Sequence, residues 1–582
     1  MNLRGFRMRH KFHSLFQAPD SLLRTALTAL LFYGVIVVVF GCYYEVYEAF
    51  LEAFYSGKLS PGYPFRSWYF IHDIGISHIY ALLYSITAEI EWRTWLLSFY
   101  LLLSAVIILK LAAAILKDKL SGLMIFFIQA GIFFLLISEH ITRFSYTRPA
   151  AMLAAAGLCA IIYYFPHSAS ISKNKGKFIA LNLLFLIAAL TRIEHVMAVT
   201  IFCFCFAACF QSGLVQAVRL FLFPFMVMLS LVAGVYIDIA RSSEFYKQIE
   251  PDLEYRMSAR GIALPPGSHT PCDTVKFRAA SERLWSDPGV MTVNYLRSLP
   301  VKSSSPLLLD PQQWRDAALR VFSVAKNSYY LVLFSLCILV LMLISGSGKK
   351  KITGLAAFQL CFWVIIFMQS YSVRINDRFF STVNCAYILL NIFAFFAIAC
   401  ERSVRHLVYF FVLMILTGAF HWSTLRQNAQ MLEEDWVNNV SNLKEISKIA
   451  SGEILVISAS SFRALLSVNK PLAPIDVSGF RKVYMNENQA VALIHPYREY
   501  LESECRCDIY DFANFYRYLK SQPSEVYFLS SEPRLLLTKD YLKCFHNFDL
   551  EVDELENIPL RDVMDHEVGS RISLKLYRMG KG

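Results

Sequence analysis

Long apolar runs recur along residues 1–420, and short polar segments separate them. Most runs hold about 17–25 residues, the length of an α-helix that crosses a hydrocarbon layer of about 30 Å. The pattern predicts eleven membrane-spanning helices: Thr25–Gly41, Thr94–Leu116, Leu120–Ser138, Pro149–Phe165, Phe178–Leu190, His195–Phe210, Val215–Ile237, Ser328–Ile344, Ile352–Gln369, Ser381–Ala399 and His406–Phe420. Residues 178–210 could instead form one interrupted span. We favour two, because a charged segment at mid-membrane is costly.

The pattern changes after about Trp422. Leu425–Ala450 has the spacing of a polar helix, and Glu453–Ser458 and Glu525–Ser530 have the short apolar runs of buried strands. A helical pattern at Asp511–Leu519 lies between those strands. This alternation predicts a C-terminal α/β domain over residues 422–582, after a membrane domain over residues 1–421. It contains neither a glycine-rich phosphate loop nor a nucleophile elbow.

Two polar segments are too long to be simple connectors. In the segment 43–93, residues 43–55 and Ile74–Ile86 have the spacing of amphipathic helices that lie on a membrane surface. The segment 238–327 is expected to fold partly as helices over the membrane surface, where it could act as a lid.

The short loops set the expected orientation. Lysine and arginine collect in alternate segments. The positive-inside rule places such segments in the cytoplasm, and here they are 4–24, 117–119, 172–177, 347–351 and 401–406. The N-terminus is then cytoplasmic and the C-terminal domain extracytoplasmic, in a plasma (inner) membrane. The basic N-terminal segment lacks a cleavage site of the small-residue type, so we expect a retained first helix.

Composition supports a polytopic helical membrane protein. Only 17% of residues are charged, against about 25% in soluble domains. The net charge of +11 therefore does not indicate nucleic-acid binding. Most of the 13 cysteines lie in or beside apolar runs and fit as small buried residues. Four lie in polar regions, where a disulfide could form but its pairing is open: Cys272, Cys505, Cys507 and Cys544. The Cys505-x-Cys507 pair has no nearby histidines, so no metal site is assigned.

Candidate binding residues collect at the ends of the spans that face outside. Three clusters, 139–148, 191–195 and 372–378, mix arginine with acid or histidine. Arginine on the outer side of the membrane is contrary to the positive-inside rule, which suggests a local reason for it. The planar guanidinium group of arginine binds phosphate through two hydrogen bonds. We therefore predict a site for an anionic lipid phosphate, with these candidates: His72, His78, Arg143, Arg148, Arg192, Glu194, His195, Arg374, Asp377 and Arg378. The alternative is that each arginine only pairs with a neighbouring acid or a lipid headgroup.

The first outer segment carries the candidate base. Glu45 follows the first span closely, so its carboxylate would lie at the membrane interface, where a raised pKa suits a general base. Asp73 is a second candidate. Glu48 and Glu52 fit better as the wet face of an interfacial helix.

These features resemble membrane glycosyltransferases of the GT-C fold, in the protein-mannosyltransferase and aminoarabinose-transferase-like group. The first outer segment, Tyr44-Glu-Val-Tyr-Glu-Ala followed by Ser56-Gly-Lys-Leu, is similar to that family's first loop. Tyr146-Thr-Arg-Pro-Ala and Thr191-Arg-Ile-Glu-His are similar to its arginine-containing turns. The family commonly shows two adjacent acids after the first span. Here Tyr44 precedes Glu45, so Asp73 could supply the second carboxylate.

The resemblance implies transfer of a sugar, with inversion, from a polyprenyl-phosphate donor to a hydroxyl of a glycan, lipid or protein. Carried onto matching positions, Glu45 is the base, and Arg148 and Arg192 position the donor phosphate. No cofactor is assigned, although some relatives use a divalent metal. Two other functions stay open: a transporter or flippase, and a non-enzymatic sensor or scaffold whose outer domain binds a ligand. A transporter would favour repeated halves and polar residues at mid-depth.

Overall fold

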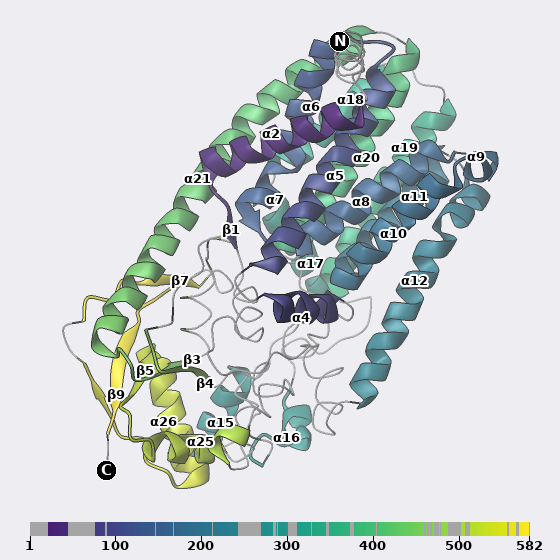
Figure 1. The fold of residues 1–582 in the computed structure, drawn as a ribbon. Coiled ribbons are helices and arrows are strands. Elements are labelled where there is room, and N and C mark those ends of the chain that lie inside the picture. The colour runs from purple at the N-terminus through teal and green to yellow at the C-terminus, as the bar shows by residue number, and fades with distance from the viewer. Residues whose placement is uncertain are drawn as a thin grey trace, which may run out of the picture.

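The computed structural model describes most of the chain. The described residues are 21–44, 76–87, 90–145, 147–166, 168–211, 213–241, 269–282, 287, 289–300, 311–327, 329–344, 349–372, 377–402, 404–458, 461, 465, 468, 470, 477, 479–486, 502–506, 512–555, 558–565 and 570–580. In Figure 1 a helical bundle occupies one end of the molecule and a smaller domain with a sheet occupies the other.

Each of the eleven predicted spans coincides with a helix. The helices are α2 (Leu22–Phe40), α5 (Trp92–Leu116), α6 (Gly122–Leu136), α8 (Thr147–Tyr164), α10 (Lys175–Thr191), α11 (Ile193–Phe206), α12 (Leu214–Arg241), α18 (Tyr329–Ile344), α19 (Lys349–Ser372), α20 (Asp377–Arg402) and α21 (Val404–Ile449). Eight helices in the described part of the chain are long and apolar enough to cross a membrane, and α6 and α18 are shorter apolar helices. Arg192 separates α10 from α11, as the favoured reading of 178–210 requires.

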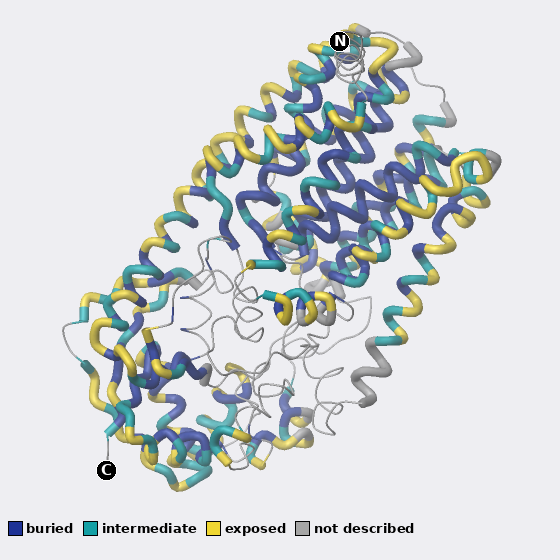
Figure 2. Tube along the Cα trace, in the orientation of Figure 1, coloured by how far each residue is buried: buried dark blue, intermediate teal, exposed yellow. Residues whose placement is uncertain are grey.

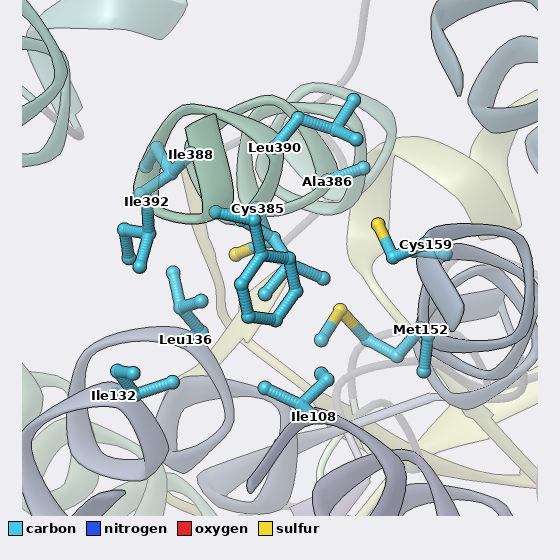
Figure 3. Close-up of a cluster of buried hydrophobic side chains, with 14 of the residues drawn as sticks. Ile108, Ile132, Leu136, Met152, Cys159, Cys385, Ala386, Ile388, Leu390 and Ile392 are labelled. Atoms are coloured by element: carbon cyan, nitrogen blue, oxygen red, sulfur yellow. The ribbon is translucent and has the colours of Figure 1, made fainter. Parts of the chain in front are cut away.

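Helices α5, α8 and α20 form the interior of the bundle, where Figure 2 shows an almost continuous buried region. Helix α8 is rich in alanine and is buried on nearly every face. Small side chains let neighbouring helices approach closely inside a membrane. Figure 3 shows side chains of α5, α6, α8 and α20 turned toward one another there, among them Ile108, Leu136, Met152 and Cys385.

A polar network lies at mid-depth between α18, α19 and α20. The side-chain amide of Gln359 donates to Asn391 at 2.7 Å, and the amide of Asn391 donates to Ser335 Oγ at 3.0 Å. The Tyr387 hydroxyl donates to Oε1 of the Gln359 side chain. These four side chains are uncharged and bond one another, which is how polar side chains hold membrane helices together.

Short elements cover the end of the bundle that faces the sheet-containing domain. They are β1 (Tyr43–Tyr44), α4 (Ile76–Ile86), α7 (Ser138–Thr142), β2 (Arg143–Phe144) and α17 (Pro311–Asn327). Figure 1 shows β1, α4 and α17 at this end, and α9 (Ser168–Lys173) at the opposite end. At that opposite end α11 continues as a short π-helix, Ala207–Gln211.

The predicted C-terminal α/β domain is present. Its sheet has the strand order β4-β3-β5-β9-β6. The strands are β3 (Ile454–Ser458), β4 (Lys482–Asn486), β5 (Val526–Ser530), β6 (Val552–Glu554) and β9 (Lys575–Met579). Strands β4, β3 and β5 are parallel, and β9 runs antiparallel to both β5 and β6. Helices α25 (Phe512–Lys520) and α26 (Glu532–His546) pack on it, and β7 (Val563–Asp565) pairs with β8 (Ser570–Ile572).

The segment 238–327 differs from the expected surface lid in the part that the structure describes. Helices α15 (Pro271–Ser281) and α16 (Val293–Ser298) contribute Ala280 and Leu296 to the core of the C-terminal domain. A disulfide joins Cys272 of α15 to Cys544 of α26, which settles the pairing that the sequence left open. Helix α17 packs instead against the bundle, where the Ser370 hydroxyl donates to the Ala317 carbonyl at 3.0 Å.

Helix α21 runs without a break from the membrane into the C-terminal domain. The sequence pattern separates a span ending at Phe420 from a polar helix beginning at Leu425, whereas the structure joins them in one helix of 46 residues. No proline interrupts it, so the backbone hydrogen bonds continue where the side chains change from apolar to polar. The expected domain boundary at 421–422 thus lies inside a helix.

Candidate functional site

A buried acid lies between two arginines at the end of the bundle that faces the C-terminal domain. Oε1 of Glu139, in α7, is 3.1 Å from Nη1 of Arg148 and 3.4 Å from Nη1 of Arg143. Burial alone would raise the pKa of Glu139, but the charges of Arg148 and Arg143 together outweigh it and lower the pKa to about 2. Glu139 is therefore a fixed negative charge.

The two arginines differ in exposure. The Arg148 side chain has no exposed surface, whereas 23% of the Arg143 side chain is exposed. Arg148 is the second residue of α8, and Arg143 is the first residue of β2, so both side chains leave the backbone close to Glu139. Of the two guanidinium groups, only that of Arg143 can meet a ligand at the surface without a rearrangement.

His140 ties this cluster to α20. Nδ1 of His140 is 3.4 Å from Nη1 of Arg148, and Nε2 of the same ring is 3.3 Å from Sγ of Cys385. All three side chains are buried. The cluster 139–148 therefore packs against α20.

The second cluster reaches the same helix. Nε of Arg192 is 2.9 Å from Oε2 of Glu194, and the ring of His195 lies 5.5 Å from the ring of Phe379 in α20. Phe379 and Cys385 are six residues apart in one helix, which corresponds to about 9 Å along its axis. The clusters 139–148 and 191–195 thus both contact α20, at points about 9 Å apart along its axis.

Strand β1 brings the start of the first outer segment to the same place. It pairs in parallel with β2, so that Tyr43 lies opposite Arg143 and Tyr44 opposite Phe144. The Tyr44 hydroxyl is 2.5 Å from Oγ1 of Thr94, and the Tyr44 ring packs edge-on against Phe144. The residue that follows Tyr44 in the chain is Glu45.

Several predicted site residues lie outside the described residues: Glu45, His72, Asp73 and Arg374. The backbone of three others is helical, in α4 for His78 and in α20 for Asp377 and Arg378. The described candidates fall into two groups, 139–148 and 192–195, that pack against one helix. Within the described residues, no group of three or more His, Cys, Asp or Glu side chains is arranged to hold a metal ion.

Two features of this region were not predicted. His421 of α21 is buried, with Nε2 at 2.8 Å from Oγ of Ser138 and Nδ1 at 3.0 Å from the Tyr330 hydroxyl. Arg93 is buried at the start of α5 beside Tyr44. The sequence gives no sign of the first, because a lone histidine at a span end has no periodic pattern. The burial of Arg93 had a usable signal, because this arginine follows Trp92 just before a predicted membrane span.

No protein-family model matches this chain, and no curated protein matches its sequence. Among solved structures, the fold is similar to that of ArnT from Cupriavidus metallidurans bound to undecaprenyl phosphate. The TM-score is 0.40 at 12% identity, with 96% of this chain and 97% of that chain covered. The apo structure of the same protein gives 0.37 at 11% identity over the same shares. Both TM-scores lie below 0.5, so this likeness carries no argument, and the chemistry rests on the residues described above.

Proposed function

We propose that this chain is a membrane glycosyltransferase that takes a sugar from a polyprenyl-phosphate donor and passes it to a hydroxyl acceptor at the extracytoplasmic face. The observation that carries the proposal is the arrangement of Arg143, Glu139 and Arg148 beside strand β1. It offers a partly exposed guanidinium at a membrane end, next to the point where the first outer segment begins.

The exposure of one guanidinium in this arrangement supports an anionic ligand. Arg148 and Arg143 share the carboxylate of Glu139, and Arg143 is the one of the two that reaches the surface. A guanidinium at the edge of a low-dielectric region binds phosphate strongly through charge-assisted hydrogen bonds. Arg148 then serves as a positioning residue, because it holds the carboxylate that orients Arg143.

The proposed reaction needs one carboxylate and one fixed cation. The acceptor oxygen attacks C1 of the sugar as its proton passes to Glu45. The bond from C1 to the phosphate oxygen breaks, and the polyprenyl phosphate leaves with its negative charge beside Arg143. A fixed positive charge stabilises that leaving group more than it stabilises the intact donor, which lowers the barrier.

The disulfide supports the proposed orientation. Disulfides persist on the oxidising side of a membrane and are rare in the cytosol. Cys272 and Cys544 both belong to the sheet-containing domain, and the candidate site lies at the end of the bundle facing that domain. The site and the domain then share the extracytoplasmic side, where polyprenyl-phosphate sugars are used.

Binding and transfer can be tested separately. The purified protein in detergent is titrated with undecaprenyl phosphate, the lipid in the ArnT structure, and with undecaprenol, which lacks the phosphate. We expect binding of the phosphate only, weakened about 10- to 100-fold by Arg143→Gln, the range expected for a charge-assisted hydrogen bond. Lys119→Gln is the matched control, because this exposed lysine follows the far end of α5, a helix about 37 Å long whose first turn contacts Tyr44.

Transfer is measured as release of undecaprenyl phosphate from a panel of undecaprenyl-phosphate sugars in the presence of membrane extract. Glu45→Gln should abolish release and leave binding of undecaprenyl phosphate unchanged. Equal binding of the phosphate and the alcohol, or full transfer by Glu45→Gln, would contradict the proposal.

A further inference from the structure

A compact cluster joins strand β1 to the C-terminal domain. Oε2 of Glu433, in α21, is 2.8 Å from Nζ of Lys470, a residue between β3 and β4. The Tyr43 hydroxyl donates to the same carboxylate. We call Tyr43, Glu433, Trp436 and Lys470 the Tyr43 cluster.

Ring faces add to the ion pair. The Lys470 ammonium lies 4.0 Å from the centre of the Trp436 ring and 5.5 Å from that of the Tyr43 ring. Both distances lie within the roughly 6 Å over which a cation is attracted to an aromatic face. Tyr43 is buried there with Val468, also of the C-terminal domain. Lys470 therefore contacts the carboxylate of Glu433 and the rings of both Trp436 and Tyr43.

A continuous set of contacts leads from this cluster to the candidate site. Tyr43 lies opposite Arg143 in the β1–β2 pair, and Arg143 pairs with Glu139. Tyr43 is also two residues before Glu45, the proposed base. Because β1 pairs with β2, a shift of Tyr43 would act on Arg143, the residue proposed to bind phosphate, and on the start of the segment that carries Glu45 in the sequence.

We propose that Glu433 and Lys470 are positioning residues for the transfer reaction. Through these two residues the C-terminal domain holds strand β1 in the position that transfer requires. This inference rests on the proposed function. The ion pair is partly exposed, with 30% of the Lys470 side chain and 43% of the Glu433 side chain in contact with solvent. Such pairs contribute about 0–1 kcal/mol to stability, so the domain should survive their loss.

The test compares single variants with a matched control. Lys470→Met and Glu433→Gln remove the ion pair, and Tyr43→Phe removes one hydrogen bond but keeps the ring. Lys575→Met is the control, because Lys575 also bridges two carboxylates in this domain, Glu532 and Glu554, and does not contact β1. We expect kcat to fall about 10- to 100-fold in the cluster variants, the scale set by misplacement of about 1 Å.

A second measurement does not depend on activity. Cys42 is a free cysteine beside Tyr43, and its labelling by a membrane-impermeant maleimide, quantified on the Cys42 peptide, reports the order of β1. Labelling should speed up in the cluster variants and stay at the wild-type rate in Lys575→Met. The double variant Glu433→Lys with Lys470→Glu restores the ion pair and should slow labelling again.

The outcomes separate the two proposals. If no sugar donor is used by the wild type, the proposed function fails, while the labelling of Cys42 still tests the link between the domain and β1. If the cluster variants keep both the wild-type labelling rate and wild-type kcat, or if Lys575→Met changes them equally, the positioning role is wrong.

Discussion

Oε1 of Glu139 lies 3.1 Å from Nη1 of Arg148, whose side chain is wholly buried. Removing one partner of such a pair leaves a charge in a low-dielectric region without its main compensation. We predict that Arg148→Met lowers the free energy of unfolding by about 3–5 kcal/mol. Thermal unfolding in detergent, followed by tryptophan fluorescence, measures it. The control is Arg278→Met, which breaks an exposed pair on α15 and should cost about 1 kcal/mol or less. Equal stability of Arg148→Met and the wild type would refute the prediction.

The same carboxylate gives a prediction about pH. Its pKa is lowered from 4.5 to about 2 in the folded protein. A group with a lowered folded pKa contributes stability that is complete above its unfolded pKa and is lost as the pH falls through the folded value. The difference in unfolding temperature between the wild type and Glu139→Gln should therefore be constant from about pH 5 to 8 and shrink below about pH 4.5. A difference that grows on acidification would show that Glu139 is not paired in this way.

Gly41 forms the turn between α2 and β1, and its φ of 79° lies in a region that other residues rarely adopt. A Cβ atom at this position would lie 2.5 Å from the Tyr43 hydroxyl oxygen. We predict that Gly41→Ala costs about 1–3 kcal/mol of stability and speeds up labelling of Cys42. Gly34→Ala in α2 is the control. It meets no atom within 4 Å and should be neutral or stabilising by up to about 1 kcal/mol. If both variants behave alike, the turn does not fix β1.

The disulfide between Cys272 and Cys544 closes a loop of 272 residues, and a cross-link over a long loop restricts the unfolded chain. Cys272→Ser should lower the stability of the C-terminal domain by about 2–5 kcal/mol and make the α15 segment more sensitive to protease. Cys505→Ser, at another cysteine of the same domain, is the control. Alkylation of Cys272 and Cys544 in the native protein before any reductant is added would show that the bond is absent.

Much of the fold could be predicted because its signals are local. Each helix of the bundle has its own apolar run, and β3 and β5 have the short apolar runs that a buried parallel strand requires. The clusters at the span ends were found in the same way, since charge beside an apolar run is visible in a short window. That both clusters contact α20 depends on how the helices pack, and no short stretch of sequence indicates that packing.

The contacts that organise the site join residues far apart in the chain. Tyr43 and Glu433 are separated by 390 residues, and His140 and Cys385 by 245. A single sequence contains no period or spacing that links such pairs. The different exposure of Arg143 and Arg148 was equally out of reach, because both lie in the same short polar cluster and only the packing of α7 and α8 tells them apart.

Helix α21 sets how far the sheet-containing domain stands from the bilayer. Its 46 residues extend roughly 69 Å, more than twice the thickness of the hydrocarbon layer. Adding one residue between the membrane and Glu433 would raise the domain by about 1.5 Å and turn it by about 100°. Lys470 would then face away from Tyr43. The length of this helix therefore fixes both the height and the rotation of the sheet-containing domain relative to β1.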